Sequence, residues 1–204
     1  ALPAATADHP GPLLMPPARR IPESIEYVRE GKWRTWGPLL LLGQDISGAT
    51  LGIIGLGRIG KEVARRASGF GMRVLAYDEY QDAEFAAKNN VEYTDMDTVL
   101  READFLTLHV ALTPETRHLI SQDEFSKMKS TAILINAARG PVVDTDALVA
   151  ALKDGEILAA ARVESRERSD CPGPANLHDE VRPRDEKHGR CNERQPQTFS
   201  SDRE

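Results

Sequence analysis

Short runs of apolar residues alternate with amphipathic stretches through the middle of the chain, from about residue 21 to residue 163. The apolar runs predict β-strands at 49–54, 73–77, 91–93, 104–110, 132–136 and 158–163. The stretches with a helical period predict α-helices at 22–30, 58–70, 95–102, 121–128 and 145–153. This alternation is typical of a parallel sheet with crossover helices, so we expect an α/β fold with a doubly wound parallel sheet.

The two ends of the chain differ in composition from this middle region. Residues 1–20 are rich in proline, which removes backbone donors and disfavours helix at the preceding residue. Residues 164–204 are polar and highly charged, and have too few large apolar side chains to offset the entropy lost on ordering. We therefore expect a non-globular, irregular segment at 1–20, a globular domain at 21–163 with a leading helix and linker at 21–47, and a disordered tail at 164–204.

Composition and charge argue against several classes of function. The chain has 204 residues, is 40% hydrophobic and carries a formal net charge of −6 at pH 7, so no global positive field attracts nucleic acid or an anionic membrane. No apolar run approaches the roughly 20 residues that cross a bilayer. Both cysteines lie in the polar tail, so we expect no disulfide scaffold and take a cytoplasmic setting as the default.

The strongest local motif is Gly55-Leu-Gly-Arg-Ile-Gly60, which follows an apolar strand and opens an amphipathic helix. In this context a G-x-G-x-x-G run predicts a dinucleotide-binding turn. Gly55 permits the tight turn, Gly57 leaves the backbone open to a pyrophosphate, and Gly60 lets helix and strand pack closely. The helix N-terminus offers free N–H groups to the phosphates, and Arg58 can add a direct contact.

Asp78 stands at the end of the second predicted strand, where this fold places an acidic residue. A carboxylate there can accept hydrogen bonds from both ribose hydroxyls and repels a 2′-phosphate, which favours NAD over NADP. The alternative is a glycine turn that only packs a strand on a helix, with Asp78 as an ordinary helix cap.

Arg139 follows the fifth predicted strand, in the run Asn136-Ala-Ala-Arg-Gly-Pro-Val-Val-Asp144. Ligands of a doubly wound sheet lie at the carboxyl ends of its strands, so Arg139 is expected near the nicotinamide end of the cofactor. A guanidinium can hold a substrate carboxylate through two hydrogen bonds and polarise a neighbouring carbonyl. The small side chains of Ala137 and Ala138 would let the cofactor approach the backbone. A surface arginine that pairs with Asp144 is the alternative.

These motifs, together with Tyr77-Asp78 and His109-Val-Ala-Leu-Thr-Pro-Glu-Thr116, resemble those of the D-isomer-specific 2-hydroxyacid dehydrogenases. The resemblance covers about residues 19–161, and the segment 20–38 fits the subgroup that reduces glyoxylate or hydroxypyruvate. It implies an oxidoreductase that converts a small 2-keto acid to the D-2-hydroxy acid with NAD as cofactor. It also implies a second, substrate-binding domain and a homodimer formed through the cofactor domain.

The resemblance also implies roles for individual residues. Arg58 and Ile59 would contact the pyrophosphate, and Asp78 would hold the adenosine ribose. Arg139 would be the catalytic arginine that binds the substrate carboxylate. The residues expected to contact the cofactor are then Gly55, Gly57, Arg58, Ile59, Gly60, Asp78, Val110, Thr116, Ala137, Ala138 and Arg139.

The sequence departs from the family pattern where the proton donor is expected. The family uses a histidine as general acid and a glutamate that keeps it protonated. The position expected for the glutamate is Arg168, and the neighbouring Glu167 lacks the flanking pattern. His178 and His188 lack the expected preceding proline and are interpreted as solvated tail residues. The resemblance places His109 beside the cofactor, outside the catalytic role.

We therefore expect an NAD-dependent 2-hydroxyacid dehydrogenase that is truncated or impaired in this form. The alternative is a catalytically inactive NAD-binding module or corepressor-like scaffold, which would bind NADH without turnover. Another Rossmann enzyme, such as an adenosylhomocysteine-type hydrolase, would keep the glycines but would not account for the runs around Thr113 and Asn136. The atypical stretches 9–17 and 162–204 suggest the hypothesis of local reading-frame slips.

Overall fold

The computed structural model describes residues 2–8, 10–162 and 179–181. One 7-stranded sheet has the order β3-β2-β1-β4-β5-β6-β7. The strands are β1 (Thr50–Ile54), β2 (Arg73–Tyr77), β3 (Val91–Tyr93), β4 (Phe105–Leu108), β5 (Ile133–Asn136), β6 (Ala159–Arg162) and β7 (Asp179–Val181). All neighbouring strands are parallel except β6 and β7, and the strand order reverses between β1 and β4. This confirms the doubly wound parallel sheet.

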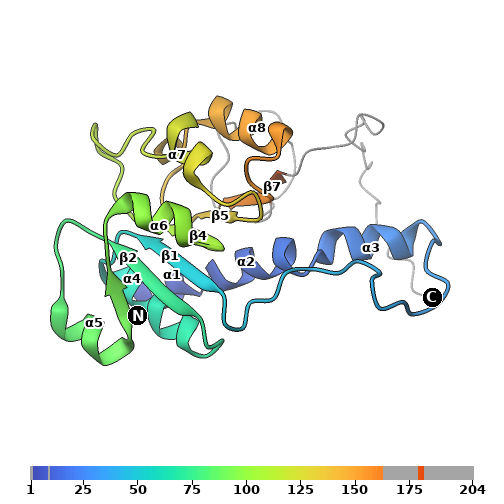
Figure 1. Cartoon of the computed structure of the whole chain (residues 1–204), viewed down its shortest axis with the longest axis horizontal. Coiled ribbons are helices and arrows are strands. Elements are labelled where there is room, and N and C mark those ends of the chain that lie inside the picture. Colours follow the sequence, from blue (N-terminus) through green and yellow to red (C-terminus); the bar gives the residue numbers. More distant parts are fainter. Residues whose placement is uncertain (1, 9, 163–178, 182–204) are drawn as a thin grey trace, which may run out of the picture.

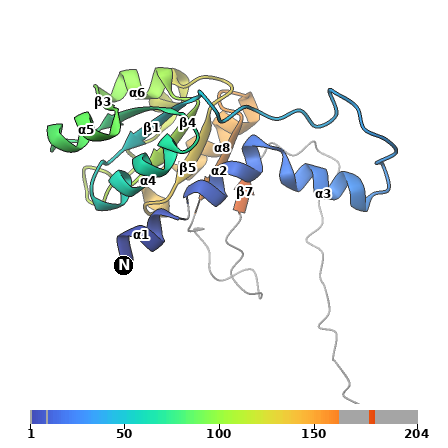
Figure 2. The same ribbon diagram turned by 90° about the horizontal axis from the view of Figure 1, so that it is seen from below.

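Helices cover both faces of the sheet (Figures 1 and 2). They are α1 (Leu2–Ala7), α2 (Pro10–Ala18), α3 (Ile21–Arg29), α4 (Arg58–Ser68), α5 (Ala83–Asn89), α6 (Met96–Glu102), α7 (Gln122–Lys127), α8 (Thr145–Asp154) and the 3₁₀ turn η1 (Gly140–Val142). One apolar core joins the sheet to α2, α4 and α5, and includes Leu14 and Val63. The other joins the opposite face to α6, α7 and α8, and includes Leu100, Phe125 and Leu148. The result is a three-layer α/β/α arrangement.

Local sequence signals set several helix boundaries. The amide of Ser121 donates to the Glu124 carboxylate over 3.0 Å, which forms part of the expected capping box of α7. Asp144 caps α8, and Gly155, with φ of +71°, ends it in the left-handed region. The sequence analysis did not predict α5, whose N-cap is Asp82. Its first-turn amide at Phe85 donates to the Asp82 side chain, an ordinary signal for a helix start.

The expectation of an irregular segment at 1–20 is wrong, because α1 and α2 form there. Pro10 lies in the first turn of α2, where its missing donor costs no helical hydrogen bond. Leu13, Leu14 and Ala18 are buried against the body of the protein. Their burial compensates for the internal prolines Pro16 and Pro17, which is a tertiary effect that local propensity does not contain.

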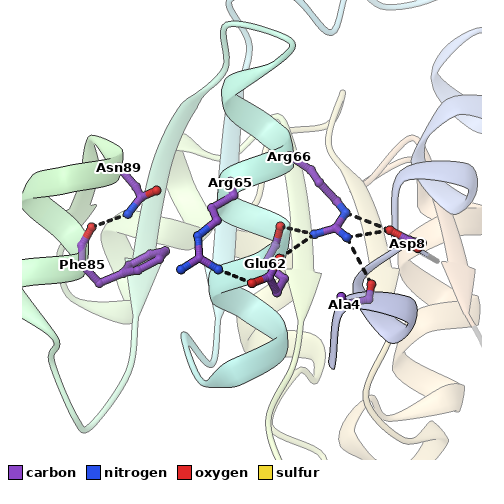
Figure 3. A network of polar contacts seen from close by, with 7 residues as sticks. All are labelled: Ala4, Asp8, Glu62, Arg65, Arg66, Phe85 and Asn89. Carbon is purple, nitrogen blue, oxygen red and sulfur yellow. Dashed lines mark hydrogen bonds and ion pairs between the residues drawn. The ribbon is translucent and has the colours of Figure 1, made fainter. Parts of the chain in front are cut away.

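An arginine on α4 holds α1 in place (Figure 3). Arg66 donates to the Asp8 carboxylate over 2.7 and 2.9 Å and to the Ala4 carbonyl over 3.2 Å. Glu62, one turn earlier on α4, accepts from the same guanidinium. On the other side of α4, the Arg65 guanidinium lies 5.0 Å from the centre of the Phe85 ring of α5. Side chains of α4 therefore contact the segments on both sides of it, α1 with Asp8 and α5.

The expected disordered tail needs one correction as well. Residues 179–181 form β7, which pairs antiparallel with β6 through Ala160–Val181 and Arg162–Asp179. The rest of the predicted tail, residues 163–178 and 182–204, lies outside the described residues.

Helix α3 and the connection after it extend away from the body of the protein (Figures 1 and 2). The helix has no buried residue. The returning chain is held to α2 by a hydrogen bond from the backbone N–H of Gln44 to the Ala18 carbonyl over 2.7 Å. We call residues 21–42 the arm; the connection at 32–47 contains no helix or strand, as expected.

None of the helices in the described residues combines the length and apolar character that a membrane span requires.

Candidate functional site

The turn between β1 and α4 depends on two glycines that bring backbones close together. Gly55 has φ of +94°, and a Cβ built there would lie 2.9 Å from the carbonyl carbon of His109. A Cβ on Gly60 would lie 2.2 Å from the Gly55 carbonyl oxygen. Side chains at either position would force the strand, the turn and the helix apart. The structural roles inferred for these two glycines therefore agree with their surroundings.

Gly57 differs from the other two glycines because its surroundings are open. No atom lies within 4 Å of a Cβ built there. Gly57 is the N-cap of α4, and the first helical hydrogen bond runs from the Lys61 amide to its carbonyl over 3.0 Å. The amides of Arg58, Ile59 and Gly60 precede that bond and have no partner within the helix. These amides and the exposed Arg58 form a positively polarised surface suited to a diphosphate.

Asp78 lies at the end of β2 and bonds directly to the glycine turn. Its Oδ2 accepts from the amide of Leu56 over 2.7 Å, and its Oδ1 accepts from the amide of Tyr80 over 2.9 Å. The amide of Gly55 also donates to the Tyr77 carbonyl over 2.9 Å. A carboxylate oxygen has more than one lone pair, so both oxygens can accept a further donor. The site can therefore hold a hydroxyl-bearing group beside the turn.

The chain after β4 is held by a threonine. The Thr116 hydroxyl donates to the Ala111 carbonyl over 2.6 Å and accepts from the Thr113 amide over 2.8 Å. These bonds fix the turn that follows Val110. Val110 itself is partly buried and packs on the core that includes α6 to α8.

His109 precedes Val110 and has a mostly buried ring. Its Nε2 lies 3.0 Å from the Thr107 hydroxyl. Its Nδ1 is buried and has no hydrogen-bond partner in the described part of the chain. Burial lowers the pKa of His109 from 6.5 to about 4. The ring is therefore neutral at physiological pH and unsuited to donate a proton, which agrees with its exclusion from the catalytic role.

A buried amide side chain shapes the turn after β5. Asn136 Oδ1 accepts from the amide of Ala138 over 3.0 Å, and Asn136 Nδ2 donates to the carbonyl of Arg139 over 2.9 Å. Arg139 is exposed, and its Nη1 donates to the Ala138 carbonyl over 2.8 Å. Ala137 is partly buried and Ala138 is buried. Sequence reasoning singled out the arginine and the alanines but missed the supporting role of Asn136.

The strand register brings these segments to one edge of the sheet. Ile54 pairs with Tyr77 on one side and with Leu108 on the other, and Leu108 pairs with Asn136. The residues that follow these four strand ends carry the glycine turn, Asp78, Val110 and the Ala137–Arg139 turn. The structure therefore brings the glycine turn, Asp78, Val110 and the Ala137–Arg139 turn to the carboxyl ends of adjacent strands, where doubly wound sheets bind ligands.

The chemistry of this edge suits a dinucleotide. It offers free helix amides beside an open glycine, a carboxylate for hydroxyl groups, a small-residue turn and an exposed guanidinium. In the described residues no group of His, Cys, Asp or Glu side chains could hold a metal ion. Glu167, Arg168, His178 and His188, which bear on the expected proton donor, lie outside the described residues.

Comparison with known proteins gives a consistent family match. Residues 12–175 match the family described as D-isomer specific 2-hydroxyacid dehydrogenase, NAD binding domain. Glyoxylate reductase of Korarchaeum cryptofilum is 53% identical over 156 residues, which is 76% of this chain and 47% of that protein. Glyoxylate reductase of Thermococcus litoralis is 49% identical over 160 residues, which is 76% of this chain and 48% of that protein.

A solved structure gives the same match. The NAD-complexed D-isomer specific 2-hydroxyacid dehydrogenase of Lactobacillus delbrueckii superposes with a TM-score of 0.72 at 41% identity, over 78% of this chain and 48% of that chain. The chain thus spans about half the length of the curated relatives it matches.

Proposed function

Because the chain belongs to the NAD-binding domain family of the D-isomer specific 2-hydroxyacid dehydrogenases, we propose that it forms the cofactor-binding part of an oxidoreductase. The reaction is the reduction of a small 2-keto acid, such as glyoxylate or hydroxypyruvate, to the D-2-hydroxy acid. Support for the substrate class comes from relatives named glyoxylate reductase. The observation that carries the proposal is the meeting of the glycine turn, Asp78 and Arg139 at one sheet edge.

NAD is the cofactor of this family, and its reduced form supplies a hydride when bound. In the proposal, the amides at the start of α4 and the Arg58 side chain hold the pyrophosphate. Gly57 leaves the approach to them open, and Ile59 contributes its amide. Asp78 accepts hydrogen bonds from the adenosine ribose, and its charge disfavours a 2′-phosphate. Val110 and Thr116 line the cofactor pocket at the end of β4.

The turn after β5 acts on the substrate. Ala137 and Ala138 leave room for the nicotinamide ring beside the backbone. The Arg139 guanidinium binds the substrate carboxylate through two hydrogen bonds and polarises the adjacent carbonyl. The Asn136 side chain stabilises this turn through its hydrogen bonds to the backbone of Ala138 and Arg139. Burial keeps His109 neutral, so proton delivery falls to a group other than His109.

The alternative is an NAD-binding module without turnover. In this alternative the same residues would hold the cofactor, and the buried His109 is unsuited to donate a proton. One assay separates the two functions. The chain is mixed with NADH and either glyoxylate or hydroxypyruvate, and NADH oxidation is followed with NADH binding measured in parallel. Keto-acid-dependent oxidation supports the oxidoreductase, whereas binding without oxidation supports the module.

We further propose that the chain forms a homodimer through its cofactor domain, with the arm as the contact. The arm exposes apolar side chains that single monomers rarely display together: Ile25, Val28, Trp33, Trp36, Leu39 and Leu42. Its charged side chains include Glu23, which pairs with Arg20, and Lys32, which pairs with Glu30. A cytoplasmic location remains a prediction from the sequence.

A further inference from the structure

The loops that follow β4 and β5 are joined by backbone hydrogen bonds. The amide of His118 donates to the Pro141 carbonyl over 2.9 Å, and the amide of Ile120 donates to the Val142 carbonyl over 3.2 Å. The amide of Asp144 donates back to the Ile120 carbonyl over 2.9 Å. The loop that begins at Val110 is thereby fixed to the turn that carries Arg139.

His118 has two unusual features at this junction. Its φ is +54°, a left-handed conformation that is uncommon outside glycine and in which His, Asn and Asp are enriched. Its Nδ1 lies 3.3 Å from Oδ2 of Asp144. Asp144 uses its other oxygen, Oδ1, to accept from the Asp146 amide over 2.9 Å at the start of α8. The Asp144 carboxylate is therefore shared between the α8 cap and the His118 ring.

The backbone carbonyl of Arg139 accepts two hydrogen bonds, one from each of the segments that flank it. Its carbonyl accepts from the Asn136 side chain over 2.9 Å and from the Val142 amide over 3.1 Å. Val142 belongs to η1, whose Pro141 carbonyl receives the His118 amide. The backbone of Arg139 is thus held by Asn136 on the β5 side and by η1 on the His118 side.

We propose that His118 is a positioning residue for Arg139. Its left-handed backbone turns the chain so that the amide meets Pro141, and its Nδ1 lies 3.3 Å from the carboxylate of Asp144, which follows η1 in the chain. Together these contacts fix η1, and η1 fixes the Arg139 backbone. The inference rests on the proposed function, because it assigns His118 to the arginine that would bind the substrate carboxylate.

Three substitutions separate the backbone and side-chain contributions of His118. His118→Asn tolerates the left-handed conformation and keeps a nitrogen at the place of Nδ1. His118→Gly tolerates the conformation but removes the side chain. His118→Ala loses both. Asn90 provides the matched control, because it has φ of +52° at the end of α5. It directly precedes β3, which three strands separate from β5 in the sheet, and it takes the substitution Asn90→Gly.

The first measurement is amide hydrogen exchange at Val142 and Asp144, read by NMR in the full chain. We expect exchange about fivefold faster in His118→Gly, since one lost polar contact is worth about 1 kcal/mol. His118→Ala should be faster still, whereas His118→Asn should stay within about twofold of the unmodified chain. Asn90→Gly should leave both amides unchanged.

The second measurement is the rate at which phenylglyoxal modifies Arg139, resolved by mass spectrometry with the exposed Arg101 as internal reference. A role confined to the α8 cap would leave this rate unchanged, whereas positioning of Arg139 predicts faster modification in His118→Gly and recovery in His118→Asn. An unchanged phenylglyoxal rate in His118→Gly overturns the proposal, whatever the amide exchange shows, as does equal behaviour of the Asn and Gly variants. NADH titration of the unmodified chain tests the proposed function separately, since neither measurement requires bound cofactor.

Discussion

The Asp78 carboxylate accepts a hydrogen bond from the backbone amide of Leu56 over 2.7 Å, so the end of β2 is bonded directly to the glycine turn after β1. Its second oxygen accepts from the Tyr80 amide over 2.9 Å. Asp78 therefore shapes the turn in addition to its proposed contact with a ribose. Removal of the carboxylate is therefore expected to affect the turn and the bound nucleotide together.

Two glycines of the turn provide a matched pair of substitutions. Gly60→Ala places a Cβ 2.2 Å from the Gly55 carbonyl oxygen, so the backbone must shift. We expect the free energy of unfolding to fall by about 1–3 kcal/mol. Gly57→Ala enters open space at φ of −70°, so its unfolding free energy should stay within about 0.5 kcal/mol of the original.

The same pair should behave differently toward NADH. A Cβ on Gly57 would occupy the approach to the free amides of α4, so NADH affinity should fall about tenfold without loss of stability. Urea denaturation and NADH fluorescence titration measure the two properties. A Gly57→Ala chain that binds NADH with unchanged affinity would contradict the placement of the pyrophosphate.

Acid should destabilise the protein through His109. Its folded-state pKa is about 4, against an ordinary value of 6.5, because the neutral ring is buried. As the pH falls through this window, the unfolded chain takes up a proton that the folded chain does not. The free energy of unfolding should therefore decrease from about pH 6.5 to pH 4, by up to about 3 kcal/mol.

The substitution His109→Gln isolates this contribution from the carboxyl groups that titrate nearby in pH. Urea denaturation of both chains across the window gives two stability curves, and their difference belongs to His109. We expect the variant curve to be flatter between pH 6.5 and 4. Parallel curves would show that the His109 ring is not held in a neutral state by burial.

The arm should control self-association. Val28→Lys places a charge on its exposed apolar surface and should convert a dimer to a monomer in sedimentation velocity. Val149→Lys, at a partly exposed position on α8 outside the arm, is the control and should remain dimeric. Both tryptophans of the chain, Trp33 and Trp36, lie on the arm, so their fluorescence reports the same transition on dilution. A wild-type chain that sediments as a monomer at all concentrations would overturn the proposal.

Much of the fold could be predicted because its signals are local. The apolar runs located β1 to β6, and the cap at Ser121 and the stop at Gly155 set helix ends through contacts within one turn. Helices α1 and α2 could not be predicted in this way. Their order depends on burial of Leu13 and Leu14 against distant strands and on the Arg66–Asp8 contact, which overcome the local effect of proline.

In the candidate site, too, local motifs could be predicted from the sequence and contacts that depend on the folded chain could not. The glycines, Asp78 and Arg139 carry chemistry that a motif reveals, so the sequence pointed to them directly. Asn136 and the Leu56 amide act through hydrogen bonds whose partners depend on the folded turn. A buried asparagine at the end of an apolar strand is the signal that could have identified Asn136, since such a side chain must satisfy its polar groups internally.

The most direct test of the account is NADH and NADPH titration of the chain, followed by fluorescence, beside Asp78→Ala, Asp78→Asn and the control Glu92→Ala. Glu92 is an exposed carboxylate on β3 that pairs with Arg73, away from the glycine turn. We predict that the unmodified chain prefers NADH and that Asp78→Ala weakens NADH binding by about tenfold or more. Asp78→Asn should lower the ratio of NADH affinity to NADPH affinity. Glu92→Ala should leave both affinities unchanged. Equal NADH affinity in the unmodified and Asp78→Ala chains would contradict the central claim that a dinucleotide binds along this edge of the sheet.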